Sequence, residues 1–156
     1  MKNLLISIFT LLTASSILSQ INPKNIEIVR DQYGVPHIYA KTDAEVAYGL
    51  AWAHCEDDFK TIQEGYLAGN ALLSKHIGLN GAAADLITQV IESEETVDKL
   101  YNTLSPDFIE VLQAYSDGMN KYAENFPDKV LVKKLFPITP KKMARYSFLT
   151  LFIANG

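Results

Sequence analysis

The densest group of side chains able to bind a metal or transfer a proton is the run His54-Cys55-Glu56-Asp57-Asp58. On a helix, His54 and Asp58 stand four residues apart on one face and could hold a metal ion between them. No HExxH pattern or other third ligand at metal-binding spacing completes such a site. We therefore interpret the run as a charged patch on a helix surface.

The remaining candidate groups are isolated in the sequence. Cys55, the single cysteine, falls within an apolar stripe, which favours core packing over a nucleophilic role. His37 and His76 have no partner motif, so each is interpreted as a structural hydrogen-bond partner. GxSxG, GxGxxG and Walker patterns are missing from the sequence. Motifs alone therefore predict no self-contained active site.

Length and composition predict one globular domain of 156 residues with a net charge of −4, which disfavours nucleic acid as the main partner. A single cysteine also excludes a disulfide framework. The charge is unevenly distributed, because residues 129–156 carry six basic side chains and no acidic one. This segment could bind an anion or a membrane surface. We favour instead a solvated face whose positive charge balances the acidic residues in the rest of the chain.

Residues 1–20 have the pattern of a secretory signal peptide. Lys2 precedes an apolar stretch from Leu4 to Leu12, and Ser19-Gln20 offers a small residue at a cleavage point. The apolar stretch is short for a bilayer, and no later segment reaches spanning length. The mature protein is expected to begin near Gln20 or Ile21, to lie in the periplasm or outside the cell, and to keep no membrane span.

The first elements expected in the mature chain are two short strands and a long helix. Residues 25–30 and 35–40 read as a β-hairpin around the turn residues 31–34. Thr42 and Glu45 form a capping box, which predicts a helix to about Leu67. Its apolar stripe has a helical spacing and consists of Trp52, Cys55, Phe59, Ile62 and Tyr66.

The second half is expected to be helical throughout. A short helix is predicted around residues 71–76 and a weaker one over 87–102. Ser105-Pro106 is a strong start signal for a helix, and Pro127 ends it. The apolar stripe of this helix consists of Phe108, Leu112, Tyr115, Met119, Tyr122 and Phe126. Thr139-Pro140 starts a final helix, and residues 148–153 have apolar side chains on every side, so we expect burial all round.

Three stretches resemble the penicillin acylase family, in that family's order and near its spacing. They are IEIVRDQYGVPHIYAKTDAEVAYGLAWAHCEDDF (26–59), LSPDFIEVLQAYSDGMNKYAENFP (104–127) and FPITPKK (136–142). The resemblance covers essentially all of residues 26–154. The EDDF wording and GYLAGNALLSKHIGLNG (65–81) look closer to the acyl-homoserine-lactone and aculeacin acylase branch than to penicillin G acylase.

The resemblance implies an exported N-terminal-nucleophile hydrolase with a four-layer αββα fold. In that family a precursor cuts itself into α and β chains, and the first serine of the β chain attacks the amide. The fold class implied here is α+β, a mainly helical α-chain fragment with an N-terminal hairpin. The domain organisation is a signal peptide at 1–20 and a partial α-chain domain at 21–156.

The resemblance places no catalytic, cofactor-binding or metal-binding residue in this chain. Leu151, Phe152 and Ile153 could approach the acyl pocket, but we favour buried helix packing for such an apolar run. The implied partners are the β-chain portion of the same precursor and a small N-acyl amide substrate. Calcium is an expectation for the full-length enzyme only.

A second function class stays open at this stage. The same scaffold could be a complete, small exported protein that binds a partner and catalyses nothing. The reading frame beyond Gly156 would distinguish the two hypotheses.

Overall fold

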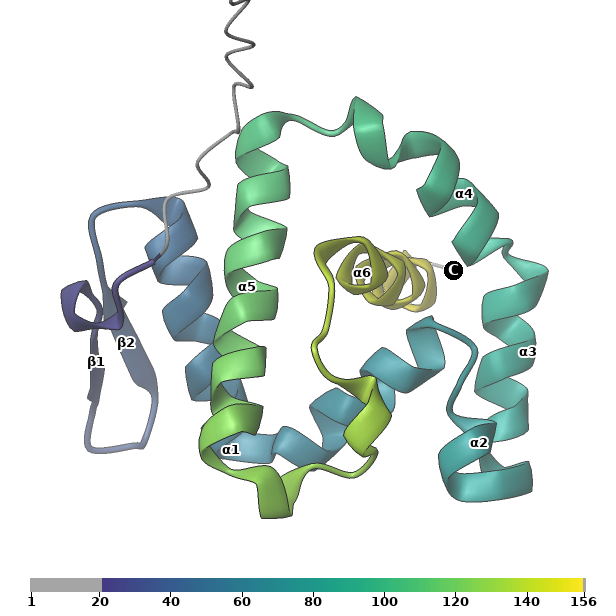
Figure 1. The fold of residues 1–156 in the computed structure, drawn as a ribbon, viewed down its shortest axis with the longest axis horizontal. Helices are drawn as coiled ribbons and strands as arrows, with labels where there is room; N and C mark the ends of the chain where they lie inside the picture. The colour runs from purple at the N-terminus through teal and green to yellow at the C-terminus, as the bar shows by residue number, and fades with distance from the viewer. Residues whose placement is uncertain (1–20, 156) are drawn as a thin grey trace, which may run out of the picture.

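The computed structural model describes residues 21–155, so the predicted signal peptide lies outside the described residues. The chain is mainly helical, with a hairpin at its N-terminal side (Figure 1). This confirms the expected fold class. The strands and α-helices are β1 Glu27–Arg30, β2 Pro36–Tyr39, α1 Asp43–Gly69, α2 Ser74–Ile77, α3 Ala82–Val90, α4 Ser93–Leu100, α5 Pro106–Asn125 and α6 Pro140–Asn155. Short 3₁₀ turns occupy Pro23–Asn25, Gly78–Gly81, Tyr101–Thr103, Pro127–Lys129 and Lys133–Leu135.

The predicted hairpin is confirmed, with β1 and β2 antiparallel and Ile28 opposite Ile38. Gly34 has a φ of 83°, which explains the glycine in the turn. The hairpin rests on α1 at Gly49, where an added Cβ would lie 2.8 Å from Ile38 Cγ2. Gly49 is therefore a glycine because the strands approach the helix backbone closely.

Helix α1 begins at the predicted capping box and ends at Gly69, but it is not continuous. Thr42 Oγ1 accepts from Glu45 N, and Glu45 Oε2 accepts from Thr42 N at 3.2 Å each. Asp58 has non-helical angles, φ −155° and ψ 74°, and its Oδ1 accepts from Thr61 N at 3.0 Å. Asp58 therefore caps a second helical segment inside α1 and marks a kink. The apolar stripe continues through this position, so it gave no sign of the kink in the sequence.

The core lies where α1 crosses α5, and both predicted stripes point into it. Met119 and Tyr122 are almost fully buried, and Trp52 packs edge-on against Tyr122 with ring centroids 5.2 Å apart. Gly118 allows the close crossing, because a Cβ there would lie 2.6 Å from Tyr48 O. The ends of the α5 stripe are less covered, since Phe108 and Phe126 remain 47% and 38% exposed.

The expected helices at 71–76 and 87–102 are wrong in their bounds. The first is the short α2, which starts only at Ser74 because Ala71 has a φ of 52°. The second is two helices, α3 and α4, separated at Glu92 with a φ of 50°. Asp85 connects α3 to the start of α2, because its carboxylate accepts from the backbone N–H groups of Leu73 and Ser74 at 2.8 Å each.

Helix α6 runs between α5 and the arc of α3 and α4, and it contacts α1, α4 and α5 (Figure 1). Two side-chain amides, of buried Gln63 and half-buried Asn120, position the loop before α6. Gln63 donates to Lys129 O at 3.1 Å and accepts from Leu131 N at 2.9 Å. Asn120 donates to Ile138 O at 2.9 Å and accepts from Ile138 N at 2.6 Å.

Candidate functional site

The side chains of the run from His54 to Asp58 make structural contacts rather than a metal site. Asp58 lies at the kink of α1, outside the continuous helix that the predicted pairing with His54 assumed. Glu56 and Asp57 accept from Arg30 at 3.3 and 2.8 Å, which ties the hairpin to α1. Over residues 21–155, no group of three or more His, Cys, Asp or Glu side chains could hold a metal ion.

His54 lies on the exposed surface of α1, whereas Cys55 lies in the core. The His54 ring is exposed and its Nδ1 lies 2.9 Å from the Tyr115 hydroxyl. Cys55 is 1% exposed, and burial raises the pKa of its thiol to about 12. A thiol that holds its proton so firmly is a poor nucleophile.

We expect Cys55 to react with iodoacetamide at least about a hundredfold more slowly in the folded chain than in urea, at about pH 8, because the thiolate is scarce and covered. The Cys55→Ala variant is the control, since it removes the only thiol. Labelling at equal rates in the two states would show an exposed thiol and return Cys55 to the list of candidate nucleophiles.

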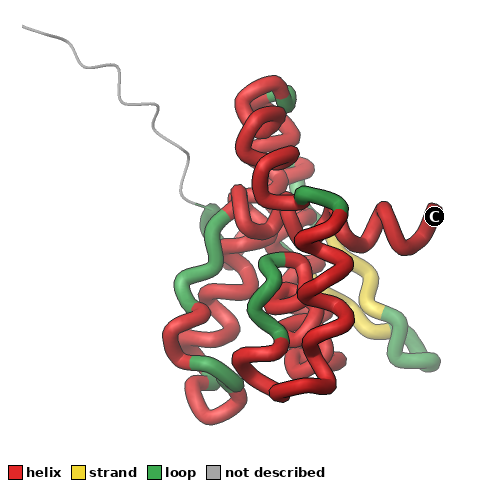
Figure 2. Tube along the Cα trace, turned by 90° about the vertical axis from the view of Figure 1, so that its right-hand side faces the viewer, coloured by secondary structure: helices red, strands yellow, loops and turns green. Residues whose placement is uncertain are grey.

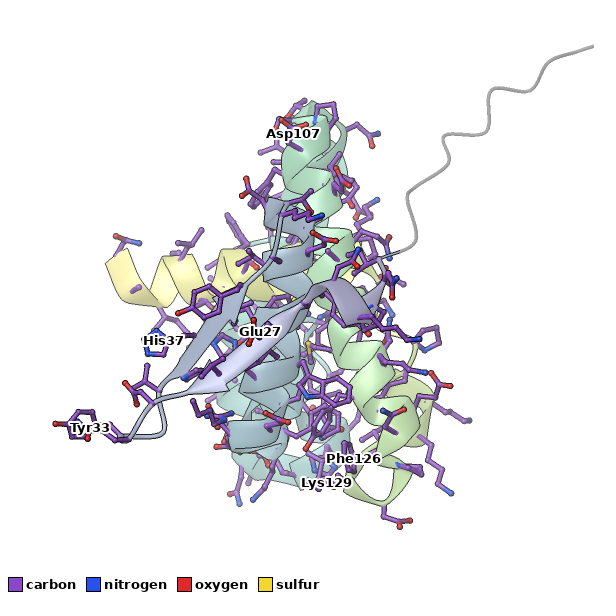
Figure 3. The ribbon with its side chains drawn as sticks, turned by 90° about the vertical axis from the view of Figure 1, so that its left-hand side faces the viewer. Glu27, Tyr33, His37, Asp107, Phe126 and Lys129 are labelled. Carbon is purple, nitrogen blue, oxygen red and sulfur yellow. The ribbon has the colours of Figure 1, made fainter. Side chains whose placement is uncertain are left out.

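His37 lies at the hairpin, away from the core. Its Nε2 is 3.3 Å from Asp31 Oδ2, and both residues are exposed (Figure 3). The backbone N–H groups of Tyr33 and Val35 donate to Asp31, and the Tyr33 bond contributes most to holding the pKa of this carboxyl below its ordinary value. Asp31 therefore organises the turn, and His37 adds a hydrogen bond to it.

The three residues expected near an acyl pocket lie on the protruding end of α6 (Figure 2). Leu151, Phe152 and Ile153 are 62%, 47% and 64% exposed. Within the apolar run only Leu149, 5% exposed, is buried by the described residues, so the burial expected on every side would need cover from outside them. Beside it, Leu151 joins side chains of α4 and α5 around an apolar hollow of about 200 Å³.

The basic C-terminal segment meets the acidic body through α6 and α4. Arg145 Nη2 lies 2.9 Å from carboxylate oxygens of both Glu94 and Asp98, and Lys141 Nζ lies 3.0 Å from Asp98. Hydrogen bonds from Arg145 and then Lys141 lower the pKa of Asp98. These contacts agree with the interpretation that the basic segment balances the charge of acidic residues elsewhere in the chain.

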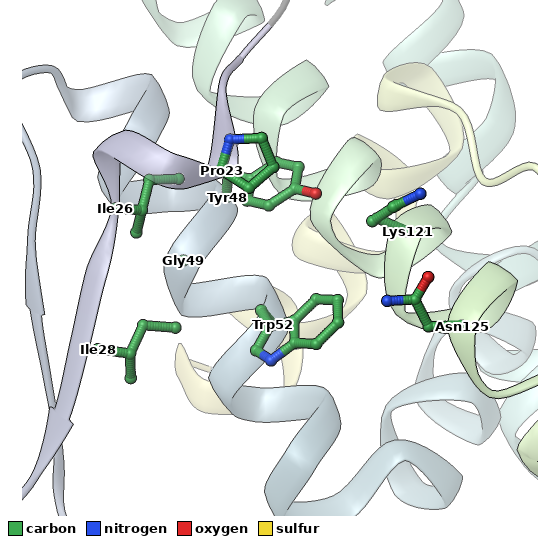
Figure 4. A pocket seen from close by; sticks show the side chains of 8 residues that line it. All are labelled: Pro23, Ile26, Ile28, Tyr48, Gly49, Trp52, Lys121 and Asn125. Atoms are coloured by element: carbon green, nitrogen blue, oxygen red, sulfur yellow. The ribbon is translucent and has the colours of Figure 1, made fainter.

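Sequence reasoning missed a hollow of about 330 Å³ between the hairpin, α1 and α5 (Figure 4). We call it the hairpin hollow; its lining is Pro23, Ile26, Ile28, Tyr48, Gly49, Trp52, Lys121 and Asn125. Pro23 to Ile28 and Lys121 are about a hundred positions apart, so no local pattern indicates that they meet. The small residues Gly49, Ala51 and Ala53 of the helix indicate close packing, but not against which segment.

None of these sites joins a nucleophile, a base and an oxyanion donor. The geometry defines a mainly helical scaffold that presents an apolar helix end and an apolar hollow. No helix among residues 21–155 is long and apolar enough to cross a membrane.

The chain belongs to the penicillin amidase family, whose profile matches residues 25–152. It is 26% identical to penicillin G acylase of Escherichia coli over 143 residues, which are 88% of this chain and 17% of that protein. It is 27% identical to the acyl-homoserine lactone acylase PvdQ of Pseudomonas fluorescens over 112 residues, 67% of this chain and 14% of that protein. The identities to these two relatives, 26% and 27%, are nearly equal. The predicted closeness to the acyl-homoserine-lactone and aculeacin acylase branch therefore stays a prediction.

The fold is also that of a solved family member. A chain of the thermostable penicillin G acylase from Alcaligenes faecalis superposes with a TM-score of 0.69 at 20% sequence identity. The match covers 83% of this chain and 73% of that one. The chain thus spans less than a fifth of the curated relatives named above but most of this solved chain.

Proposed function

We propose that the chain is the N-terminal, α-chain portion of an exported acylase precursor that hydrolyses the amide bond of an N-acyl compound. The family match over residues 25–152 carries this proposal. The small share of the curated relatives that the chain spans supports it too, because the catalytic groups would then belong to a β chain outside the 156 residues.

In this proposal the chain contributes shape and apolar surface rather than catalytic groups. The β-chain serine attacks the acyl carbonyl while its own α-amine takes the proton. Leu151, Phe152 and Ile153 would then line one side of the acyl pocket, since an exposed apolar helix end suits an acyl group. Export would follow from residues 1–20 and would deliver the enzyme to the periplasm or the medium. Calcium would bind to the full-length enzyme.

The test compares the 156-residue chain with the precursor encoded by any reading frame that continues past Gly156. We expect acyl release from phenylacetyl-amide and long-chain acyl-amide reporters by the precursor and none above background by residues 1–156. Turnover by the short chain that is lost in Cys55→Ala or His54→Ala would contradict the proposal, because it would place catalysis in the cluster on α1.

One observation favours the binding-module alternative. The described residues already bury a core of their own, in which Cys55, Met119 and Tyr122 are at most 1% exposed. A chain with such a core can fold and bind without a second chain. A stop codon directly after Gly156, together with cooperative unfolding of the chain, would support this alternative over the acylase.

A further inference from the structure

Two neighbouring hollows lie along α5. The hairpin hollow of about 330 Å³ is mostly apolar, with the Trp52 ring on its α1 side (Figure 4). A second hollow of about 530 Å³ includes Asp117 and Glu124 of α5 in its lining, and we call it the acidic hollow. Tyr48 and Lys121 line both, so the two hollows adjoin. A concave apolar surface with a few convergent polar groups is the usual form of a small-molecule site.

The charges that line the acidic hollow do not cancel. Lys121 Nζ lies 2.9 Å from Glu124 Oε2, so these two side chains offset each other. Asp117 is half-buried and accepts a hydrogen bond from the Gln113 amide at 2.8 Å, but no ion pair among residues 21–155 includes it. Burial raises the pKa of the Asp117 carboxyl, because its charge is poorly solvated. One negative charge therefore has no counter-charge in the described part of the chain.

The Tyr48 hydroxyl is a second acceptor at the same place. Tyr48 is only 7% exposed, and its hydroxyl makes no hydrogen bond within residues 21–155, although a polar group in so covered a residue normally has a partner. Figure 4 shows this hydroxyl directed toward α5. Burial raises its pKa, and the charges of Asp117 and Glu124 raise it further. The hydroxyl is therefore neutral and lies in a negative potential, which suits a positively charged donor.

The apolar wall of the hairpin hollow is in place before any ligand arrives. The Trp52 indole donates from Nε1 to Glu56 Oε1 at 2.9 Å, and Glu56 is itself paired with Arg30 of the hairpin at 3.3 Å. The hairpin lies as close to α1 as a glycine allows, since a Cβ at Gly49 would lie 2.8 Å from Ile26 Cγ2. A preformed wall lowers the cost of ordering side chains when a ligand binds.

We propose that the two hollows together bind a small organic amine with an apolar body. The ammonium group lies in the acidic hollow and donates to the Asp117 carboxylate and the Tyr48 hydroxyl, and the body lies on Trp52 in the hairpin hollow. Charge-assisted hydrogen bonds are stronger than neutral ones, so the site selects the amine over a neutral molecule of the same shape. The site is separate from the exposed end of α6 and does not depend on amide hydrolysis.

Trp52 makes binding observable, because it is the only tryptophan in the 156-residue chain. We expect a saturable change in Trp52 emission on titration with 2-phenylethylamine at about pH 7, where an alkylamine is protonated. The neutral analogue 2-phenylethanol is expected to bind about tenfold more weakly, and the anion 3-phenylpropionate more weakly still. No saturation by the amine, or an affinity for the alcohol or the acid equal to that for the amine, would overturn the proposal.

A matched pair of variants separates the site from the net charge of the chain. Asp117→Asn should weaken 2-phenylethylamine about tenfold and leave 2-phenylethanol unchanged, because it removes the charge and keeps the shape. Asp128→Asn makes the same charge change in an exposed 3₁₀ turn and should alter neither affinity. Equal effects of the two substitutions would overturn the proposal.

The Lys121–Glu124 pair gives a test of sign. Lys121→Met should tighten the amine about threefold, because it removes a competing cation, whereas Glu124→Gln should weaken it about threefold, because the unpaired Lys121 then repels the ammonium. Circular dichroism checks that each variant is folded. Changes of the opposite sign would place the charged group of the ligand elsewhere and overturn the proposal. Emission that changes with protein concentration alone would assign the hollows to a second copy and also overturn it.

Discussion

Gly69→Ala will destabilise the chain by about 3 kcal/mol, the upper part of the usual range for overpacking a tight contact. A Cβ at Gly69 would lie 2.4 Å from the Cα atom of Tyr146. The added Cβ is fixed by the α1 backbone and the Cα atom of Tyr146 belongs to the α6 backbone, so the clash can be relieved only by moving α6 away from α1. The displacement would also shift the exposed end of α6, where the acyl pocket is proposed.

Gly65→Ala is the matched control, because it adds the same methyl group to the same helix opposite the same residue. Here the Cβ would lie 2.9 Å from Tyr146 Cε2, an atom of a side-chain ring that can move. Alanine also gains about 1 kcal/mol of helix propensity over glycine, so the net change should be close to zero. Urea unfolding of both variants gives the comparison. Equal losses would contradict the tight backbone contact between α1 and α6.

Local signals predicted the elements that local contacts determine. The capping box at Thr42 and Glu45 and the Ser105-Pro106 start of α5 are found in the structure, because caps depend on residues within one turn. The turn at Gly34 was predictable for the same reason. The Asp58 kink was also encoded locally, as an aspartate three residues before Thr61, but the apolar stripe runs through it and favoured one straight helix.

Long-range placement could not be predicted from the sequence. The distant partners of Gln63 are backbone groups at Lys129 and Leu131, more than sixty positions away, and a glutamine inside a helix gives no indication of them. The hairpin hollow likewise exists only after β1 and α5 have both packed on α1. The apolar character of α6 was evident from the sequence, whereas the difference between buried Leu149 and exposed Leu151 depends on how α6 packs on the other helices.

The exposed end of α6 is expected to make the chain associate with itself. Leu151, Phe152 and Ile153 form one exposed apolar surface, and covering each such side chain contributes about 1.5–3 kcal/mol. Surfaces of this kind usually bind a partner, and a second copy is the partner present in a pure sample. We therefore expect the folded chain to self-associate as its concentration rises, measured by sedimentation velocity.

Substituting the three exposed residues with serine, as Leu151→Ser, Phe152→Ser and Ile153→Ser together, should give a monomer. The free energy of unfolding of that monomer should change by less than about 1 kcal/mol, because these side chains bury little in the chain itself. Leu149→Ser on the same helix should instead cost about 3 kcal/mol, since it removes a buried side chain and buries a hydroxyl. An unaltered chain that stays monomeric at every concentration would show that this surface needs no cover. The binding-module alternative would then gain over the acylase precursor, in which a β chain is expected to cover the end of α6.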